Sequence, residues 1–207
     1  PKQLNIVILA IAAVFSFMTY QRNFVWKDEL TLWEDAVKKF PNKGRTYNGR
    51  GDALLRLDRM DEALQDFNRA IRFQPDNPEA LSNRGFIYGV KGRFDLALID
   101  LNKAVELNPE LVQAYRNRGV IYTNKGLQEE AFADFNKAIE LEPGYPGDYS
   151  SRGVIYGMYG RLDEALLDFN MAIGLSPSFA GAYFNRARVY FIQKDYTRSW
   201  LDVKKAQ

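Results

Sequence analysis

The most constraining feature of this 207-residue chain is a pattern that recurs every 34 residues without an insertion. Small residues and a proline keep this step along the chain. The series are Gly51, Gly85, Gly119, Gly153 and Ala187, then Ala63, Ala97, Ala131, Ala165 and Ser199, then Pro41, Pro75, Pro109, Pro143 and Pro177. A repeat of this length is one supersecondary unit that cannot bury its own apolar face, so the units must stack on one another. The units are 44–77, 78–111, 112–145, 146–179 and a shorter one, 180–207.

Each unit predicts two helices. In the unit 112–145 the first helix carries aromatic and small residues four and three apart, and the second continues with small and large residues at helical spacing. These residues are Tyr115, Gly119 and Tyr122, followed by Ala131, Phe135, Ala138 and Leu141. Gly126 is placed to end the first helix and Pro143 to stop the second.

This order of residues resembles the tetratricopeptide repeat (TPR): an aromatic residue and glycine in the first helix, alanine and phenylalanine in the second, and a late proline. The resemblance covers residues 44–207, and it departs from the pattern at Leu54, Ala187 and Ser199. It implies an all-α fold, a right-handed TPR superhelix of five repeats plus a half repeat.

The half repeat is predicted in a joint segment, residues 24–43. Residues 28–40 fall where a second helix is due, with Trp33 at the position that Phe67 and Phe135 occupy in later units. The first-helix position before it, residues 10–24, is hydrophobic. Either this segment replaces a first helix, or a flexible joint around residues 21–23 separates it from the repeats.

The segment 1–23 predicts a transmembrane anchor. Residues 3–21 carry no charge, and nineteen helical residues span about 28 Å, close to the ~30 Å hydrocarbon core of a bilayer. Tyr20, Phe24 and Trp26 fit an interfacial aromatic belt. A buried core helix and a cleavable signal peptide are the alternatives, although no small-residue cleavage site follows. Flanking charges do not decide the orientation of the helix.

Composition excludes several kinds of chemistry. The chain has no Cys and no His, which removes disulfides, thiolate ligands, the commonest general base and the commonest zinc ligand. Phosphate-binding glycine motifs are absent as well. The formal net charge is only +2, which argues against nucleic-acid binding. We therefore predict a chain that is not an enzyme, without catalytic residues, metal site or cofactor.

Charged residues also recur at the 34-residue step, with one arginine and one aspartate in each unit. They are Arg50, Arg84, Arg118, Arg152 and Arg186, and Asp66, Asp100, Asp134, Asp168 and Asp202, accompanied by Asn68, Asn102, Asn136 and Asn170. They could form a cationic ladder that binds phosphate or carboxylate ligands. The one-to-one stoichiometry instead favours bidentate pairs that hold each hairpin in register.

The resemblance implies a concave groove, lined by the first helices, that binds a protein or peptide partner. Positions two, five, nine, twelve and thirteen of each unit would face this partner. The candidate residues are Asn48, Asp52, Arg56, Phe86, Val90, Arg116, Val120, Asn124, Val154, Met158, Phe184, Arg188, Phe191 and Ile192. Gly89 and Gly157 are expected to leave room for partner side chains. Self-burial or an oligomer contact would also explain the apolar character of this set.

At the C-terminal end, Phe191, Trp200 and Val203 are expected to be exposed. Solenoid ends need a polar cap, so this end would be covered by further chain, by a partner or by a second copy through self-association.

Three functions are compatible with these features. The first is a membrane-anchored TPR scaffold that mediates protein–protein interaction. The second follows from residues 20–43, which resemble the joint in bacterial multi-spanning membrane proteins with C-terminal TPR tails, some of them glycosyltransferase-like. The chain would then be such a tail, with its repeats in the periplasm or exterior binding acceptor proteins and with catalysis elsewhere. The third is an accessory subunit of an integral membrane complex.

Overall fold

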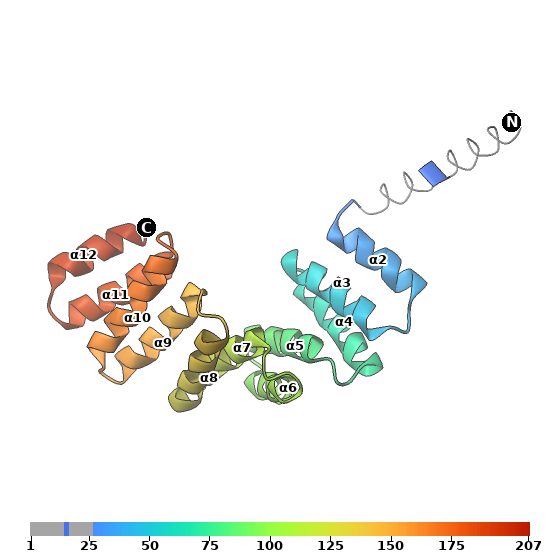
Figure 1. Ribbon diagram of the computed structural model, residues 1–207, viewed down its shortest axis with the longest axis horizontal. Coiled ribbons are helices and arrows are strands. Elements are labelled where there is room, and N and C mark those ends of the chain that lie inside the picture. Colours follow the sequence, from blue (N-terminus) through green and yellow to red (C-terminus); the bar gives the residue numbers. More distant parts are fainter. Residues whose placement is uncertain (1–14, 17–26) are drawn as a thin grey trace, which may run out of the picture. The chain divides into compact units, whose positions relative to one another are not determined.

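The computed structural model describes residues 15–16 and 27–207, and the regular elements among these residues are α-helices (Figure 1). Helix α2 (Glu29–Lys39) is followed by five helical hairpins. The hairpins are α3 (Gly44–Arg56) with α4 (Met60–Phe73), α5 (Pro78–Val90) with α6 (Phe94–Leu107), α7 (Val112–Asn124) with α8 (Gln128–Leu141), α9 (Pro146–Met158) with α10 (Leu162–Leu175), and α11 (Ala180–Ile192) with α12 (Tyr196–Lys205). The all-α prediction and its two helices per unit are confirmed.

The chain divides into two compact units, residues 1–80 and residues 81–207, which we call the N-terminal unit and the C-terminal unit. Each is described by itself below. The right-handed superhelix running through all five repeats stays a prediction.

The predicted anchor, residues 3–21, lies outside the described residues except for Phe15 and Ser16, which are helical. The first-helix position at residues 10–24 and the joint at residues 21–23 fall in the same part of the chain. Within residues 15–16 and 27–207, none of the helices combines the length and the apolar character that crossing a bilayer requires.

Close packing of small and aromatic residues joins the two helices of a hairpin. A Cβ atom added to Gly153 in α9 would lie 2.8 Å from the ring of Phe169 in α10. Phe169 is buried with Ala165, and Val189 of the next first helix completes the cluster. One hairpin therefore buries its apolar face only when the following hairpin covers it.

The turn inside each hairpin contains one residue in the left-handed backbone conformation. These residues are spaced 34 apart along the chain. Gly92, Gly126 and Gly160 have φ angles of 71° to 74°, which glycine adopts without steric strain. Asp58 and Lys194 take the same conformation in the first and last hairpins. The prediction that Gly126 marks the end of a first helix is confirmed, since α7 ends two residues earlier.

The arginine and aspartate series form bidentate pairs inside each hairpin. Arg118 donates from Nε and Nη2 to both carboxylate oxygens of Asp134, at 2.8 and 2.7 Å. Its Nη1 donates to Asn102 of the preceding hairpin at 2.9 Å. Burial raises the pKa of Asp134, against the opposing effect of Arg118.

The same pairing recurs along the chain. The other pairs are Arg50–Asp66, Arg84–Asp100, Arg152–Asp168 and Arg186–Asp202. Asn136 and Asn170 accept from Arg152 and Arg186 in the way that Asn102 accepts from Arg118. The series is therefore a structural ladder that links helices within and between hairpins, and its arginines are committed to these partners.

Helix α2 occupies the second-helix position of the predicted half repeat. It begins with a capping box in which Asp28 accepts from the Thr31 amide at 2.8 Å and donates from its own amide to Thr31 Oγ1. Trp33 packs against Gly49 of α3 so closely that a Cβ atom at Gly49 would overlap the indole. A helix therefore lies where the second helix of the half repeat is predicted, and the half repeat itself stays a prediction.

Gly49→Ala should destabilise the N-terminal unit by about 2 kcal/mol, because the added methyl group overpacks against Trp33. Urea unfolding followed by circular dichroism measures the change. Gly157→Ala is the matched control, since an added Cβ there meets nothing within 4 Å. That control should gain about 0.5–1 kcal/mol from helix propensity. The same response at both glycines would contradict the packing described here.

Candidate partner-binding groove

The first helices of the C-terminal unit carry most of the predicted groove residues. Phe86 and Val90 of α5 and Val120 and Asn124 of α7 line one concave pocket of about 170 Å³. The side chains of Phe86, Val90 and Val120 are 39, 55 and 47% exposed. Four residues chosen from the sequence are thus brought together around an apolar hollow that is open to solvent.

Gly89 and Gly157 have different surroundings. A Cβ atom at Gly89 would overlap Cδ1 of Ile121, so the space beside this glycine is already filled by the next first helix. The prediction that Gly89 leaves room for a partner is therefore wrong. Gly157 has open space beside it, as predicted.

A second pocket, of about 150 Å³, lies between α9 and α11. It contains Val154, Met158, Arg188 and Ile192 from the predicted set. Val189 and Phe169 close its inner side and Gly157 lies in its wall. This pocket is a further place where the stacked first helices leave apolar surface uncovered.

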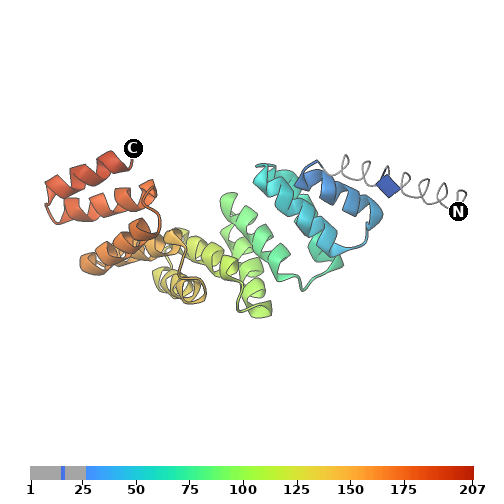
Figure 2. The same cartoon turned by 45° about the horizontal axis from the view of Figure 1, so that its top comes forward.

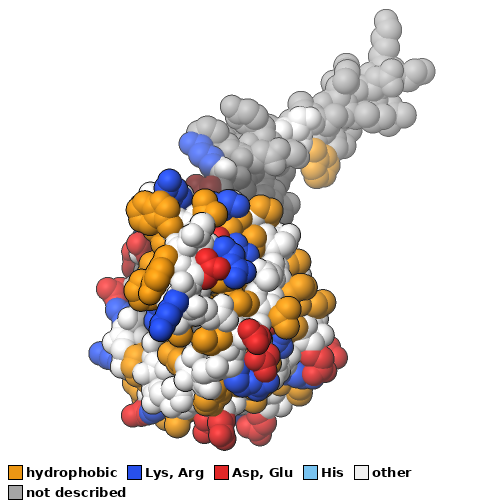
Figure 3. Space-filling model, turned by 90° about the vertical axis from the view of Figure 1, so that its left-hand side faces the viewer, with side chains coloured by type: hydrophobic (Ala, Val, Ile, Leu, Met, Phe, Trp, Pro, Cys, Tyr) orange, Lys and Arg blue, Asp and Glu red, His pale blue; other side chains and the backbone are white. Residues whose placement is uncertain are grey.

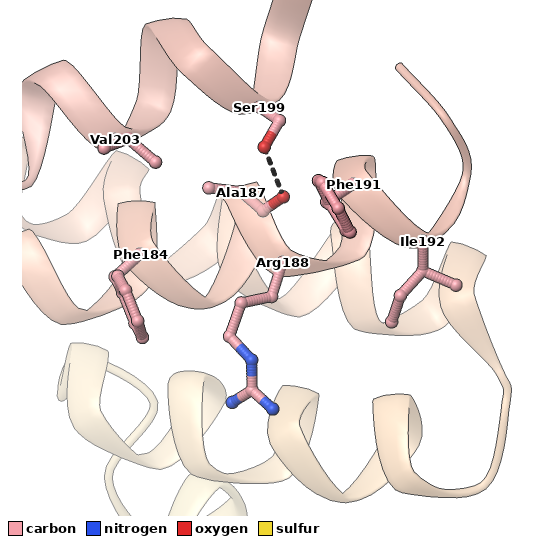
Figure 4. Close-up of a pocket in the computed structure, with 7 residues that line it drawn as sticks. All are labelled: Phe184, Ala187, Arg188, Phe191, Ile192, Ser199 and Val203. Carbon is pink, nitrogen blue, oxygen red and sulfur yellow. Dashed lines mark hydrogen bonds between the residues drawn. The ribbon is translucent and has the colours of Figure 1, made fainter. Parts of the chain in front are cut away.

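A third pocket, of about 380 Å³, lies on the last hairpin between α11 and α12 (Figure 4). Phe184, Arg188, Phe191 and Ile192 come from α11, and Ser199 and Val203 from α12. The exposure predicted for this end is confirmed for Phe191 and Trp200, whereas Val203 is only partly exposed.

Arg116 does not have a free guanidinium in the groove. Its Nε donates to Asp148 at 2.8 Å, its Nη1 lies 2.9 Å from Glu142, and the group stacks over the ring of Tyr145. Burial raises the pKa of Asp148, and the hydrogen bond from Arg116 opposes that shift. The arginine is thus held in an ionic cluster between α7 and α9.

The sequence analysis did not predict this cluster, because its residues come from α7, from α9 and from the loop between α8 and α9. Asp148 has no counterpart of the same type in neighbouring units, which was the one available signal.

The predicted residues of the N-terminal unit are polar. Asn48, Asp52 and Arg56 are four residues apart on α3 and so lie on one side of this helix. Arg56 forms an ion pair with Glu29 of α2. Burial raises the pKa of Asp52 to about 6, although the charge of Arg56 opposes the shift. The candidate set is therefore polar on α3, in contrast to the apolar residues that line the pockets of the C-terminal unit.

In the described ranges no group of three acidic side chains could hold a metal ion. The chemistry that these surfaces offer is burial of apolar side chains with a few hydrogen bonds, as in the recognition of a polypeptide.

Asp52 should make the N-terminal unit less stable as the pH rises from about 4 to about 6. The folded state raises this pKa, so folding favours the protonated carboxyl, and that advantage is lost as the group ionises. Asp52→Asn should remove the decline and gain about 1 kcal/mol at neutral pH. Urea unfolding across this pH range measures it, with Asp76→Asn on an exposed turn as the control. Parallel pH profiles for the parent chain and Asp52→Asn would refute the assignment.

Comparison with known families agrees with the repeat boundaries. A model described as "TPR repeat" matches residues 51–92, and one described as "Tetratricopeptide repeat" matches residues 78–111 and 112–145. The last two ranges are the same as two of the units derived from the 34-residue step.

The chain is similar to part of Protein O-mannosyl-transferase TMTC3 from Homo sapiens, with 33% identity over 88 residues. This match covers 42% of the chain and 10% of the human protein. The Drosophila melanogaster protein of the same name is 36% identical over 67 residues, 32% of this chain and 7% of that protein. The chain thus spans about a tenth of the length of these relatives.

Solved structures share the fold. The crystal structure of YrrB, described as a TPR protein with an unusual peptide-binding site, has a TM-score of 0.67 and 20% identity over 84% of this chain and 90% of that one. A crystal structure of MamA has a TM-score of 0.65 and 25% identity, covering 75% of this chain and 91% of that one. Residues 51–145 of this chain are therefore tetratricopeptide repeats by sequence, and the hairpins on either side of them have the same fold.

Proposed function

We propose that this chain is a TPR scaffold that binds a protein or peptide partner on its first helices. The pocket on α5 and α7 carries the proposal, because Phe86, Val90 and Val120 are exposed there around an apolar hollow. Apolar surface gathered in a hollow gains free energy when a partner removes it from water. YrrB, which has the same fold, is described as having a peptide-binding site, and this supports the proposal.

The partner would insert apolar side chains and satisfy a few polar groups. The side-chain amide of Asn124 lies at the edge of the pocket and can both donate and accept a hydrogen bond. The second pocket, with Val154 and Met158, would receive a further apolar side chain. A segment with apolar residues at intervals fits this surface better than a strongly charged one.

Phe86→Glu combined with Val120→Glu should reduce capture of the partner by about tenfold or more, since the two carboxylates make burial of the pocket unfavourable. Crosslinking in native membranes, followed by mass spectrometry, identifies and quantifies the partner.

The matched control is Ile99→Glu with Leu167→Glu, two side chains that are each 65% exposed on the second helices α6 and α10. This pair should leave capture unchanged. Equal loss of capture in both pairs, or loss of helicity in the first pair alone, would show that Phe86 and Val120 do not form a binding surface.

The scaffold is proposed to be held at a membrane by residues 3–21. The uncharged run of nineteen residues supports this, because it matches the thickness of the hydrocarbon core. In this arrangement the repeats present their pockets near the bilayer, where an integral membrane complex would supply partners.

A second candidate function is a C-terminal tail of a membrane glycosyltransferase, binding acceptor proteins in the periplasm or exterior while catalysis takes place outside residues 1–207. Similarity to proteins named O-mannosyl-transferases favours it. The similarity covers less than half of this chain, so it supports a shared repeat region and leaves the activity as a proposal.

One experiment separates these candidates. An antibody raised against residues 44–207 should detect the protein in carbonate-washed membranes of the source cells. Immunoprecipitates from detergent extracts of these membranes should show mannosyl-transferase activity if the chain is an enzyme tail, and no such activity if it is a scaffold. Recovery of the protein in the carbonate wash would contradict membrane anchoring in both forms.

A further inference from the structure

The hairpins of the C-terminal unit join through one recurring contact. A branched aliphatic side chain from each first helix enters the space between the helices of the preceding hairpin. Ile121 lies against Gly89, Ile155 against Ala131 and Phe135, and Val189 against Ala165 and Phe169. All three aliphatic side chains are buried. The receiving face of a hairpin is therefore built to accept one isoleucine or valine from a helix.

The last hairpin has the same receiving face. Ser199 and Val203 stand 34 residues after Ala165 and Phe169, and they line the pocket between α11 and α12. The Ser199 hydroxyl donates to the carbonyl oxygen of Ala187 at 2.9 Å, so its polar group is satisfied inside the hairpin (Figure 4). The floor of this pocket is therefore ready to receive an apolar side chain.

The rim of the pocket is unusually apolar for exposed surface. Phe184, Phe191 and Ile192 are 54, 62 and 61% exposed. Phe191 replaces the small residue that stands at Gly89 and Gly157 in earlier units, so it widens the contact area offered to an incoming helix. Figure 3 shows hydrophobic side chains exposed on this side of the molecule, with both basic and acidic side chains between them.

The charge of the last hairpin differs from that of the hairpins before it. Residues 180–207 contain six basic and two acidic residues, a net charge of 6 − 2 = +4, whereas residues 146–179 contain two basic and four acidic residues, a net charge of −2. Both acidic residues already pair with arginines, Asp195 with Arg198 and Asp202 with Arg186. The positive excess includes Arg188, which lines the pocket with its guanidinium pointing away from α12 (Figure 4), and Lys204 on α12.

We propose that the outer face of the last hairpin binds an acidic amphipathic α-helix of a partner protein. An isoleucine or valine of that helix enters between Ala187, Ser199 and Val203, as Val189 does one hairpin earlier. Aspartate and glutamate residues along the margins of the helix pair with the basic residues around the pocket. A second copy docked through the same face fits less well, because two such faces would bring equal positive charges together.

This inference goes beyond the proposed function, since it concerns a different pocket and states the chemistry of its ligand. The two are tested by different variants. Phe86→Glu with Val120→Glu should leave binding at the last hairpin unchanged.

The probes are two fluorescein-labelled, side-chain-stapled helical peptides of about 18 residues. They share one apolar face with a central isoleucine and differ in having glutamate or lysine along the margins. Fluorescence anisotropy with the full chain should show the glutamate peptide binding about tenfold or more tightly than the lysine peptide, with affinity falling as salt rises. Replacing the isoleucine of the glutamate peptide with alanine should lower its affinity for the chain by about tenfold.

Variants of the chain locate the site. Val203→Glu should abolish binding of the glutamate peptide, whereas Leu201→Glu, at an exposed position of the same helix outside the pocket, should leave most of it. Arg188→Glu with Lys204→Glu should reverse the preference toward the lysine peptide. Circular dichroism checks that each variant keeps its helicity, and a variant that loses helicity is replaced by the milder Val203→Thr, for which a partial loss of affinity is expected.

Three results would overturn the proposal. The first is equal affinity for the two peptides. The second is unchanged binding by a folded Val203→Glu chain. The third is a dimer of the chain alone, seen by sedimentation and lost in Val203→Glu, which would assign this face to a second copy.

Discussion

The structure depends on one constraint: a helical hairpin of this size cannot bury its apolar face alone. Within a hairpin, a small residue such as Gly153 lets the two helices approach until Phe169 fills the space between them. The outer side of that contact stays open until Val189 of the next hairpin covers it. Each hairpin is therefore stabilised by its contact with the next one. In the described part of the chain, the face of the last hairpin that would receive such a contact is uncovered.

The arginine–aspartate ladder fixes the register in which the helices pack. Apolar contacts between repeats of similar shape would tolerate a shift in register, whereas a bidentate pair such as Arg152–Asp168 forms at one alignment only. Asn136 extends the pair to the preceding hairpin. Since these aspartates are buried and their arginines partly so, separating a partner would leave an uncompensated charge. The ladder thus uses most of the repeated charge for structure, and recognition falls to apolar pockets.

The pockets lie at positions where the residue type differs from one repeat unit to the next. Residues at the groove positions vary from unit to unit, from Asp52 and Arg56 on α3 to Val120 on α7 and Met158 on α9. Sequence spacing could place these residues on one side of the first helices, because helix geometry and the 34-residue step fix the side on which each residue lies. It could not show that Ile121 fills the space beside Gly89, or that Arg116 bridges to Asp148 and Glu142, since both depend on contacts between neighbouring hairpins.

The sequence by itself determined the helical hairpins, the 34-residue step between them and the pairing of arginine with aspartate. These follow from the spacing of residue types along the chain, which can be read from a single sequence without knowledge of tertiary contacts. Only the tertiary structure decided which exposed residues form pockets and which are used in packing. Phe86 and Val120 line an open hollow, whereas Arg116 is held by its neighbours, because the distance between adjacent helices and the size of the facing side chain decide whether space remains.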